Sequence, residues 1–403
     1  METLQRPSSD NLKESFTEVL EPILFKNILC TTEGSNCWKL LDWSLNNFAA
    51  KCGNSKLPFR VGRNTYTIEP QWEVNTEIEH KTMEEFLRDT TRNCDSSKWF
   101  YFDYKYMNKW FNDKPEILES FNWQQFGLDL GSSDSTIWVG SKGAHTNCHQ
   151  DTYGCNLVAQ THGRKLWLLF SPKCTSFMQP TRIPYEESTI YSKYNFFSPS
   201  QIEIQAIQNM LEPVKMVILE PRDVLFIPKG WWHYVESLDT SLSVNIWLPL
   251  KEDCISRLKE TLVHLVINTI GDGVSRTEDQ SESSLLECVE LLENSIKECK
   301  IASLVQEPSI KKKKINVDIT NVLQSLKMKY SSYMKSLPDL TSKNISDFTS
   351  KNNIVASNIS KNNQHVTESN QPSKLELIEA VVDAFCNPEI VENVSKILMH
   401  KFL

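Results

Sequence analysis

Residues 219–237 read LEPRDVLFIPKGWWHYVES, a stretch with two apolar runs that each follow a turn signal. Proline and aspartate at 221–223 predict a tight turn, and the apolar run Val224–Ile227 predicts a short buried strand. A second turn, Pro-Lys-Gly at 228–230, comes next, and His233 opens the following strand. The stretch therefore predicts two neighbouring strands of a β-rich domain, with a histidine close to the turn that joins them.

Further strand-like runs surround this stretch, and Gly, Pro and Asp separate most of them. They are Thr136–Val139, Leu157–Gln160, Lys165–Phe170, Val214–Leu219 and Leu242–Trp247. All eleven tryptophans lie between Trp38 and Trp247, as is typical of a β-rich globular domain. Because no strand–helix–strand rhythm is evident, an antiparallel sandwich or barrel is favoured over a parallel sheet. The predicted fold is mainly β with flanking helices.

The chain changes character after residue 250. Apolar residues then recur at three- and four-residue spacing, which predicts amphipathic helices: Ile255, Leu258, Leu262 and Leu265, then Leu285, Val289, Leu292 and Ile296. Residues 335–372 are rich in Ser, Asn and Lys and predict a disordered linker. Ser373 and Glu376 then form a capping-box pattern ahead of a terminal helical segment. This segment could dock on the body, on a second copy as a homodimer, or on another protein.

These patterns divide the chain into five parts. They are N-terminal α/β elements packing on the barrel (1–95), the β core (96–250), a helical region (251–334), the disordered linker (335–372) and a C-terminal helical segment (373–403).

Composition excludes several classes of protein. The net charge is −8, and residues from 251 onward hold 19 basic against 21 acidic side chains, so no nucleic-acid partner is expected. No apolar run approaches the roughly 20 residues that span a bilayer, and the N-terminus lacks a secretory signal. The eleven cysteines form no C-x-x-C pair, which favours reduced thiols. We expect a cytoplasmic protein that binds no membrane; the short run Lys311–Lys314 indicates a solvated patch rather than a nuclear address, although nuclear presence stays open.

His149 and Asp151 form a His-x-Asp pair. Two residues apart on a strand, their side chains project to the same side and can share one metal ion. About one such pair is expected by chance in a chain with eight His and 51 acidic residues, so the pair alone carries no weight. If strand pairing brings His233 alongside, the three residues form the facial triad of non-haem Fe(II) oxygenases. Alternatively, His233 is a satisfied core histidine.

A facial triad leaves metal positions open for a 2-oxo acid, whose far carboxylate needs a buried cation. Lys165 is placed for that role, because its neighbours Trp167 and Leu169 are apolar and expected to face inward on the same strand. A buried lysine without an anion is costly, so an inward Lys165 implies a carboxylate partner. The alternative is an ordinary lysine at the surface end of a strand.

Two other groups invite competing interpretations. His145 and His149, with Cys148 between them, suggest zinc, but the zincin pattern requires a helix and a Glu where Thr146 stands. The insertion 171–213 is expected to cover the cavity mouth and face the substrate, or its charged residues form a surface ion cluster, which is the default interpretation. The residues concerned are Arg182, Tyr185, Glu186 and Glu187.

Residues 136–247 resemble a JmjC domain of the cupin superfamily. The resemblance rests on IWVGSKGAHTNCHQD, YGCNLVAQTHGRKLWLLF, PRDVLFIPKGWWHYVES and SVNIW. The segments DYKY (103–106) and PTRIPYEES (180–188) are similar to a family member that associates with small heat shock proteins. The resemblance implies a double-stranded β-helix core of the jelly-roll type that holds Fe(II) and 2-oxoglutarate, and it makes a small heat shock protein an expected partner.

The family's site residues fall on named positions of this chain. The metal triad falls on His149, Asp151 and His233, and the cation for the distal carboxylate on Lys165. Further co-substrate contacts are implied for Tyr101, Thr146, Asn156 and Asn245. Alternatively, Thr146 is an ordinary β-former, and Asn156 and Asn245 are hydrogen-bonded strand or turn residues.

The resemblance implies a 2-oxoglutarate-dependent dioxygenase of the JmjC hydroxylase type. Its expected reaction is hydroxylation of a protein side chain, coupled to decarboxylation of 2-oxoglutarate to succinate. One alternative is a lysine demethylase. Another is a non-catalytic binding module or scaffold for a small heat shock protein.

Overall fold

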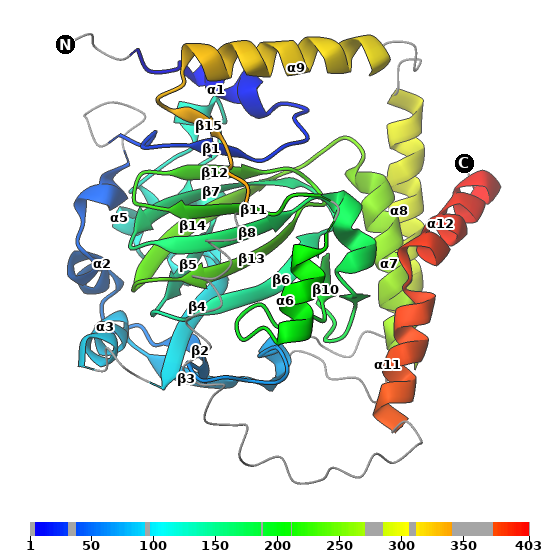
Figure 1. Ribbon diagram of the computed structural model, residues 1–403, viewed down its shortest axis with the longest axis horizontal. Helices are drawn as coiled ribbons and strands as arrows, with labels where there is room; N and C mark the ends of the chain where they lie inside the picture. The colour runs from blue at the N-terminus through cyan, green and yellow to red at the C-terminus, as the bar shows by residue number, and fades with distance from the viewer. Residues whose placement is uncertain are drawn as a thin grey trace.

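Two antiparallel sheets lie face to face in the computed structural model, and helices surround them (Figure 1). The structure describes residues 5–30, 38–92, 97–186, 188–210, 212–270, 285–305, 312–340 and 374–402. Every strand pair within these ranges is antiparallel. The predicted fold class, a mainly β jelly-roll core with flanking helices, is confirmed.

The larger sheet has nine strands. Their order is β15 (Met334–Ser336), β1 (Ile23–Phe25), β12 (Val224–Ile227), β7 (Cys155–His162), β14 (Ser241–Leu248), β5 (Thr136–Gly140), β4 (Lys98–Tyr106), β2 (Leu57–Arg63) and β3 (Glu77–Lys81). The smaller sheet has six. Their order is β11 (Lys215–Leu219), β8 (Lys165–Phe170), β13 (Trp232–Ser237), β6 (His145–Asp151), β10 (Thr189–Ser192) and β9 (Pro180–Thr181).

Strand β8 illustrates how alternation divides the side chains between two environments. Trp167 and Leu169 pack in an apolar cluster between the sheets, as the sequence pattern predicted. Leu168 and Phe170 point the other way, into a cluster beneath the 171–213 insertion. Lys165 begins the strand in phase with the inward pair, so its side chain also enters the space between the sheets.

Helices cover the outer surfaces of the two sheets. The N-terminal half contributes α1 (Ser9–Phe16), α2 (Leu45–Cys52), α3 (Met83–Arg92), α4 (Met107–Trp110) and α5 (Pro115–Leu118), and the largest apolar cluster lies between them and the nine-stranded sheet. Short 3-10 helices are η1 (Lys39–Asp42), η2 (Glu73–Asn75), η3 (Gln124–Phe126), η4 (Ser132–Asp134) and η5 (Pro172–Phe177). The remaining helices are α6 (Gln201–Gln208), α7 (Asp253–Ile270), α8 (Leu285–Val305), α9 (Lys312–Lys329), α11 (Lys374–Phe385) and α12 (Pro388–Phe402).

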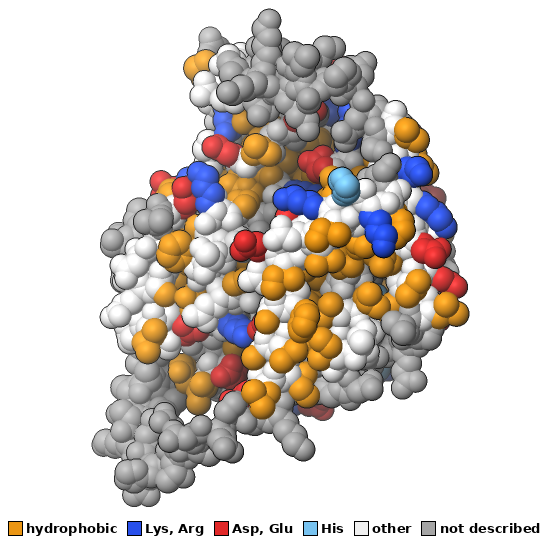
Figure 2. All heavy atoms as spheres, turned by 90° about the vertical axis from the view of Figure 1, so that its right-hand side faces the viewer, with side chains coloured by type: hydrophobic (Ala, Val, Ile, Leu, Met, Phe, Trp, Pro, Cys, Tyr) orange, Lys and Arg blue, Asp and Glu red, His pale blue; other side chains and the backbone are white. Residues whose placement is uncertain are grey.

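The C-terminal segment docks on the body of its own chain. Helices α11 and α12 both lie against α7, with Val382 and Val391 packed around Leu262 (Figure 1). Asp383 accepts a hydrogen bond from Thr181 at 2.9 Å and forms an ion pair with Lys193 at 2.6 Å, both in the insertion. Apolar side chains remain exposed on the outer faces of these helices (Figure 2), namely Leu377, Val381, Phe385, Ile390, Val394, Ile397 and Phe402.

The segment after α9 still pairs with the two sheets past residue 335, where the predicted linker begins. Met334–Ser336 pairs with β1, and Leu337 is buried between the sheets, because this stretch still carries apolar residues. The rest of the predicted linker, residues 341–372, falls outside the described residues. The nine cysteines of the described residues are free thiols. None of the helices that the structure describes combines the length and the apolar character needed to cross a membrane.

Candidate active site

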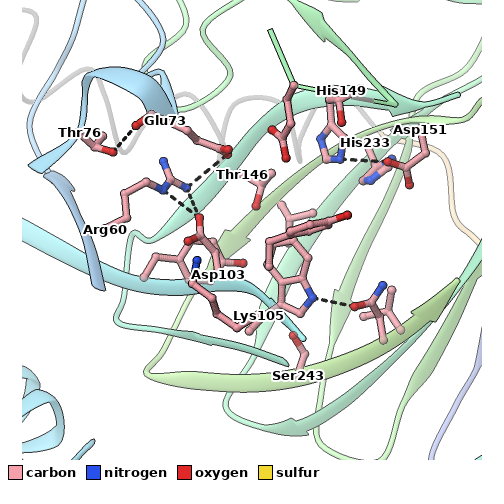
Figure 3. Close-up of a pocket in the computed structure, with 18 of the residues that line it drawn as sticks. Arg60, Glu73, Thr76, Asp103, Lys105, Thr146, His149, Asp151, His233 and Ser243 are labelled. Carbon is pink, nitrogen blue, oxygen red and sulfur yellow. Dashed lines mark hydrogen bonds and ion pairs between the residues drawn. The ribbon is translucent and has the colours of Figure 1, made fainter. Parts of the chain in front are cut away.

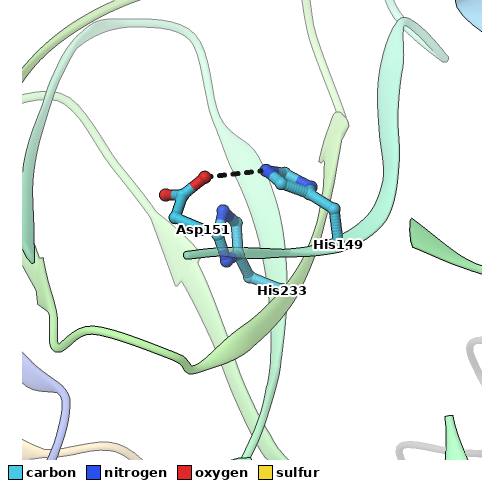
Figure 4. Close-up of side chains that lie close together, drawn as sticks. All are labelled: His149, Asp151 and His233. Atoms are coloured by element: carbon cyan, nitrogen blue, oxygen red, sulfur yellow. Dashed lines mark ion pairs between the residues drawn. The ribbon is translucent and has the colours of Figure 1, made fainter. Parts of the chain in front are cut away.

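The three candidate metal ligands meet on neighbouring strands of the six-stranded sheet (Figure 4). β13 pairs with β6 in a register that sets His233 directly opposite His149, and their ring centroids are 4.1 Å apart. Asp151 projects to the same side, with its Oδ1 3.7 Å from Nε2 of His149. One ligand atom from each of the three residues lies within 4.8 Å of the others. The spacing suits a single metal ion bound by all three.

Backbone hydrogen bonds hold both imidazoles in the tautomer that a metal requires. Nδ1 of His149 lies 2.8 Å from the carbonyl oxygen of Asn147, and Nδ1 of His233 lies 3.0 Å from that of Trp231. Since a carbonyl only accepts, each Nδ1 donates and each Nε2 presents its lone pair to the cavity. Burial, with a further contribution from His149, lowers the pKa of His233 to about 4, so this imidazole is neutral at pH 7.

A β-bulge decides which residues of β6 face the cavity. His233 pairs with His149, but Val235 pairs with Thr146, so β6 carries one extra residue between the two pairs. Residues three apart face opposite sides of a regular strand, whereas this bulge turns both Thr146 and His149 toward the cavity. Cys148 points to the outer face and packs in the cluster under the insertion.

Lys165 lies buried deeper in the same cavity, with 1% of its surface exposed. Its ammonium donates to Oγ of Ser243 at 2.8 Å and to the hydroxyl of Tyr101 at 3.2 Å. Burial lowers the pKa of Lys165 to about 7, opposed only by the more distant Asp103. Among the described residues, no carboxylate lies within ion-pair distance of this ammonium. The site therefore provides a buried cation that an incoming carboxylate would stabilise.

The two predicted asparagines contact one another across β7 and β14. Nδ2 of Asn245 donates to Oδ1 of Asn156 at 2.8 Å, and Oδ1 of Asn245 accepts from Nε1 of Trp138 at 2.7 Å and from Thr136. Both asparagines also line the cavity. Their hydrogen bonds fix the amide orientations without removing the side chains from the cavity wall.

One cavity of about 890 Å³ contains all eight predicted site residues (Figure 3). They are Tyr101, Thr146, His149, Asp151, Asn156, Lys165, His233 and Asn245. Three charged residues for which no site role was predicted lie across the cavity from the triad. Arg60 on β2 pairs with Asp103 at 2.8 Å and with Glu73 at 3.6 Å. No motif identifies this cluster, because its members come from three separate segments.

The zinc interpretation fails because two of its members face away from the third. His145 is buried on the other side of β6, stacked on Phe197 with ring centroids 4.3 Å apart. Its Nδ1 lies 2.9 Å from the carbonyl oxygen of Gly143. Among the described residues, the only His/Cys/Asp/Glu group spaced to hold a metal is the triad itself.

The insertion 171–213 was predicted either to cover the cavity mouth or to carry a surface ion cluster, and neither interpretation holds for all of its residues. Arg182 forms a buried ion pair with Glu260 of α7, so it does not belong to a surface ion cluster. Tyr185, which that prediction did not include, stacks on His264 with ring centroids 5.7 Å apart. Helix packing rather than solvent surrounds them, which corrects the default prediction. Glu186 instead lines the cavity, and Glu187 falls outside the described residues.

The sequence profile of the cupin-like domain family matches residues 9–253, which include both sheets except β15. This chain belongs to the cupin-like family. The predicted membership in the JmjC branch of the cupin superfamily is thereby confirmed. The match begins well before residue 136, where the quoted motifs start, because β1 to β4 extend the larger sheet of the same domain.

Several named proteins are similar to this chain. HSPB1-associated protein 1 of Rattus norvegicus is 38% identical over 277 residues, which cover 65% of this chain and 55% of the rat protein. The HSPB1-associated protein 1 homolog of Danio rerio is 31% identical over 345 residues, covering 82% of this chain and 74% of the fish protein. Lysine-specific demethylase JMJ30 of Arabidopsis thaliana is 28% identical over 234 residues, which cover 56% of this chain and 49% of the plant protein. The chain thus spans little more than half the length of the rat relative.

Proposed function

We propose that this cupin-like protein is an Fe(II)- and 2-oxoglutarate-dependent oxygenase that hydroxylates a protein side chain. His149, Asp151 and His233 would hold the metal, since their three ligand atoms converge and leave the cavity side of the site open. Bound iron and 2-oxoglutarate would supply the oxidising chemistry for an unactivated C–H bond. The protein's own share is to hold both groups, orient the substrate and exclude water.

The observation that carries this proposal is the position of Lys165 in the same cavity as the triad. A fully buried ammonium bound only to hydroxyls is expensive unless an anion joins it. A dicarboxylate that chelates a metal at one end and meets Lys165 at the other satisfies both groups. Tyr101, Thr146, Asn156 and Asn245 line the same cavity and would orient the bound acid.

Binding can be tested before any substrate is known. Anaerobic addition of Fe(II) and then 2-oxoglutarate should produce the weak visible metal-to-ligand charge-transfer band, and admitting oxygen should release succinate. A search for +16 Da or demethylation changes between cells with wild-type and triad-variant protein then identifies the product class. Absence of the visible band at saturating 2-oxoglutarate would contradict the proposal.

A second function, association with a small heat shock protein, is supported by the names of the relatives from rat and zebrafish. The exposed apolar side chains of α11 and α12 offer a surface for it (Figure 2). Co-purification of the full chain with a small heat shock protein, repeated with His149→Ala and with Phe385→Asp, separates the two functions. Retained association in the first variant and loss in the second would assign the partner to the helices.

A further inference from the structure

Three aromatic residues form one wall of the cavity beside the metal triad. The ring of Tyr104 lies 5.4 Å from that of Trp247 and 5.8 Å from that of Trp138, and all three residues line the cavity. Tyr104 sits at the bulge of β4 with a φ of 51°, and 40% of its surface is exposed. Part of this aromatic side chain is therefore open to a ligand in the cavity. The faces of aromatic rings attract cations.

Carboxylates stand beside this wall without enough cations to balance them. Glu186 accepts a hydrogen bond from the hydroxyl of Tyr191 and lies next to the carboxyl of Glu73. Arg60 pairs with Glu73 and Asp103, and within the described part of the chain no Lys, Arg or His forms an ion pair with Glu186. Burial, with the nearby negative charge of Glu73, raises the pKa of Glu186 well above its usual value. A positive group at this place would relieve the repulsion.

These carboxylates and rings adjoin the metal ligands directly. Tyr191 pairs with His149 across β10 and β6, and their ring centroids are 6.1 Å apart. Trp247 donates through Nε1 to Oδ2 of Asp151 at 3.4 Å. A side chain whose charged end lies between Glu186 and Tyr104 therefore has its carbon atoms close to the triad.

We infer that the substrate presents a cationic side chain with N–H donors, arginine or unmethylated lysine, to Glu186, Glu73 and the face of Tyr104. The inference rests on the proposed oxygenase function and adds the substrate class. Carboxylate oxygens are acceptors, and a guanidinium or primary ammonium offers them donors that a quaternary ammonium lacks. The aromatic faces alone would accept either kind of cation.

The test uses the full chain loaded with Zn(II), which is redox-inert, and 2-oxoglutarate. Five pentapeptides, acetyl-Gly-Gly-X-Gly-Gly-amide, carry arginine, lysine, trimethyl-lysine, citrulline or norleucine at X. Their dissociation constants are measured by ligand-observed NMR. We expect the arginine or lysine peptide to bind at least about tenfold more tightly than its neutral counterpart, citrulline or norleucine, because charge-assisted hydrogen bonds contribute that much.

Two variants test whether Glu186 causes the preference for charged peptides. Glu186→Gln should reduce the charged-to-neutral ratio to about one, whereas Glu77→Gln, at an exposed position on the same cavity rim, should leave it unchanged. Equal binding of charged and neutral peptides, tightest binding of trimethyl-lysine, or no binding of any peptide would overturn the inference. The same spectra report whether 2-oxoglutarate binds. If it does not, the proposed function fails; if it binds without a peptide preference, the substrate inference alone fails.

Discussion

The space between the two sheets has an apolar half and a polar half. In the first, Leu169, Val217, Leu219, Leu225 and Ile227 pack with almost no exposed surface. In the second, the same strands and their neighbours place an ammonium, two imidazoles and two amides around a cavity. The apolar half stabilises the fold by removing surface from water. The polar half lowers stability unless its groups acquire partners, as is common where residues are placed for function.

His149→Ala tests the polar half most severely. Removing one of three metal ligands should reduce 2-oxoglutarate turnover by more than about 10³-fold, because the ligand acts as part of a unit. The measurement is succinate release under saturating Fe(II). Gln150→Ala is the matched control, since this neighbouring side chain donates to the carbonyl of Gly230. Wild-type-like release from His149→Ala would remove iron chemistry from this site.

Leu169→Ala makes the complementary change in the apolar half. The side chain is fully buried on the strand that also carries Lys165, so its truncation should lower the free energy of unfolding by about 2–5 kcal/mol. Urea titration measures this loss. Turnover per folded molecule should stay near that of the wild type. A stable variant with lost turnover would show that the two halves are not separate in role.

Lys165→Met asks whether the buried cation serves a ligand or the fold. Loss of a charge-assisted contact should raise the 2-oxoglutarate concentration for half-saturation by about 10–100-fold. The thermal midpoint without co-substrate should not fall, because a buried ammonium lacking an anion costs stability. Lys105→Met, at a half-buried position of the same cavity lining, is the control. Unchanged co-substrate affinity would refute the assigned role.

The free energy of unfolding should depend on pH by a smaller amount, and the lowered pKa of Lys165 gives the sign of this effect. Burial lowers the pKa of Lys165 to about 7, below that of an unfolded lysine, so the unfolded state binds more protons above pH 7. Stability contributed by this residue is therefore lowest at and below pH 7 and rises toward pH 10. Relative to Lys165→Met, the wild-type free energy of unfolding should increase by about 1.4 kcal/mol per pH unit between pH 8 and 9. A flat difference would indicate that the lysine is solvated.

Much of the fold was predictable because strand patterns are local. The ranges Lys165–Phe170 and Val224–Ile227 match β8 and β12 residue for residue. Alternation along a strand fixes which side chains share a face, so the inward Lys165, Trp167 and Leu169 follow from the sequence. Alternation alone does not predict which side chains share a face where a strand contains a β-bulge. Thr146 and His149 share the cavity only because β6 gains a residue opposite β13.

By itself, the sequence determined the residue types of the site and the strands that carry them, since both depend on short-range spacing. Residue patterns made His149, Asp151, His233 and Lys165 candidates, and the family resemblance added the two asparagines. Only the tertiary structure decided that Arg60 faces Glu73, that Glu186 enters the cavity while Arg182 turns to α7, and where α11 and α12 dock. These outcomes depend on register, bulges and long-range packing, for which the contacting residues lie too far apart in the chain to leave a local pattern.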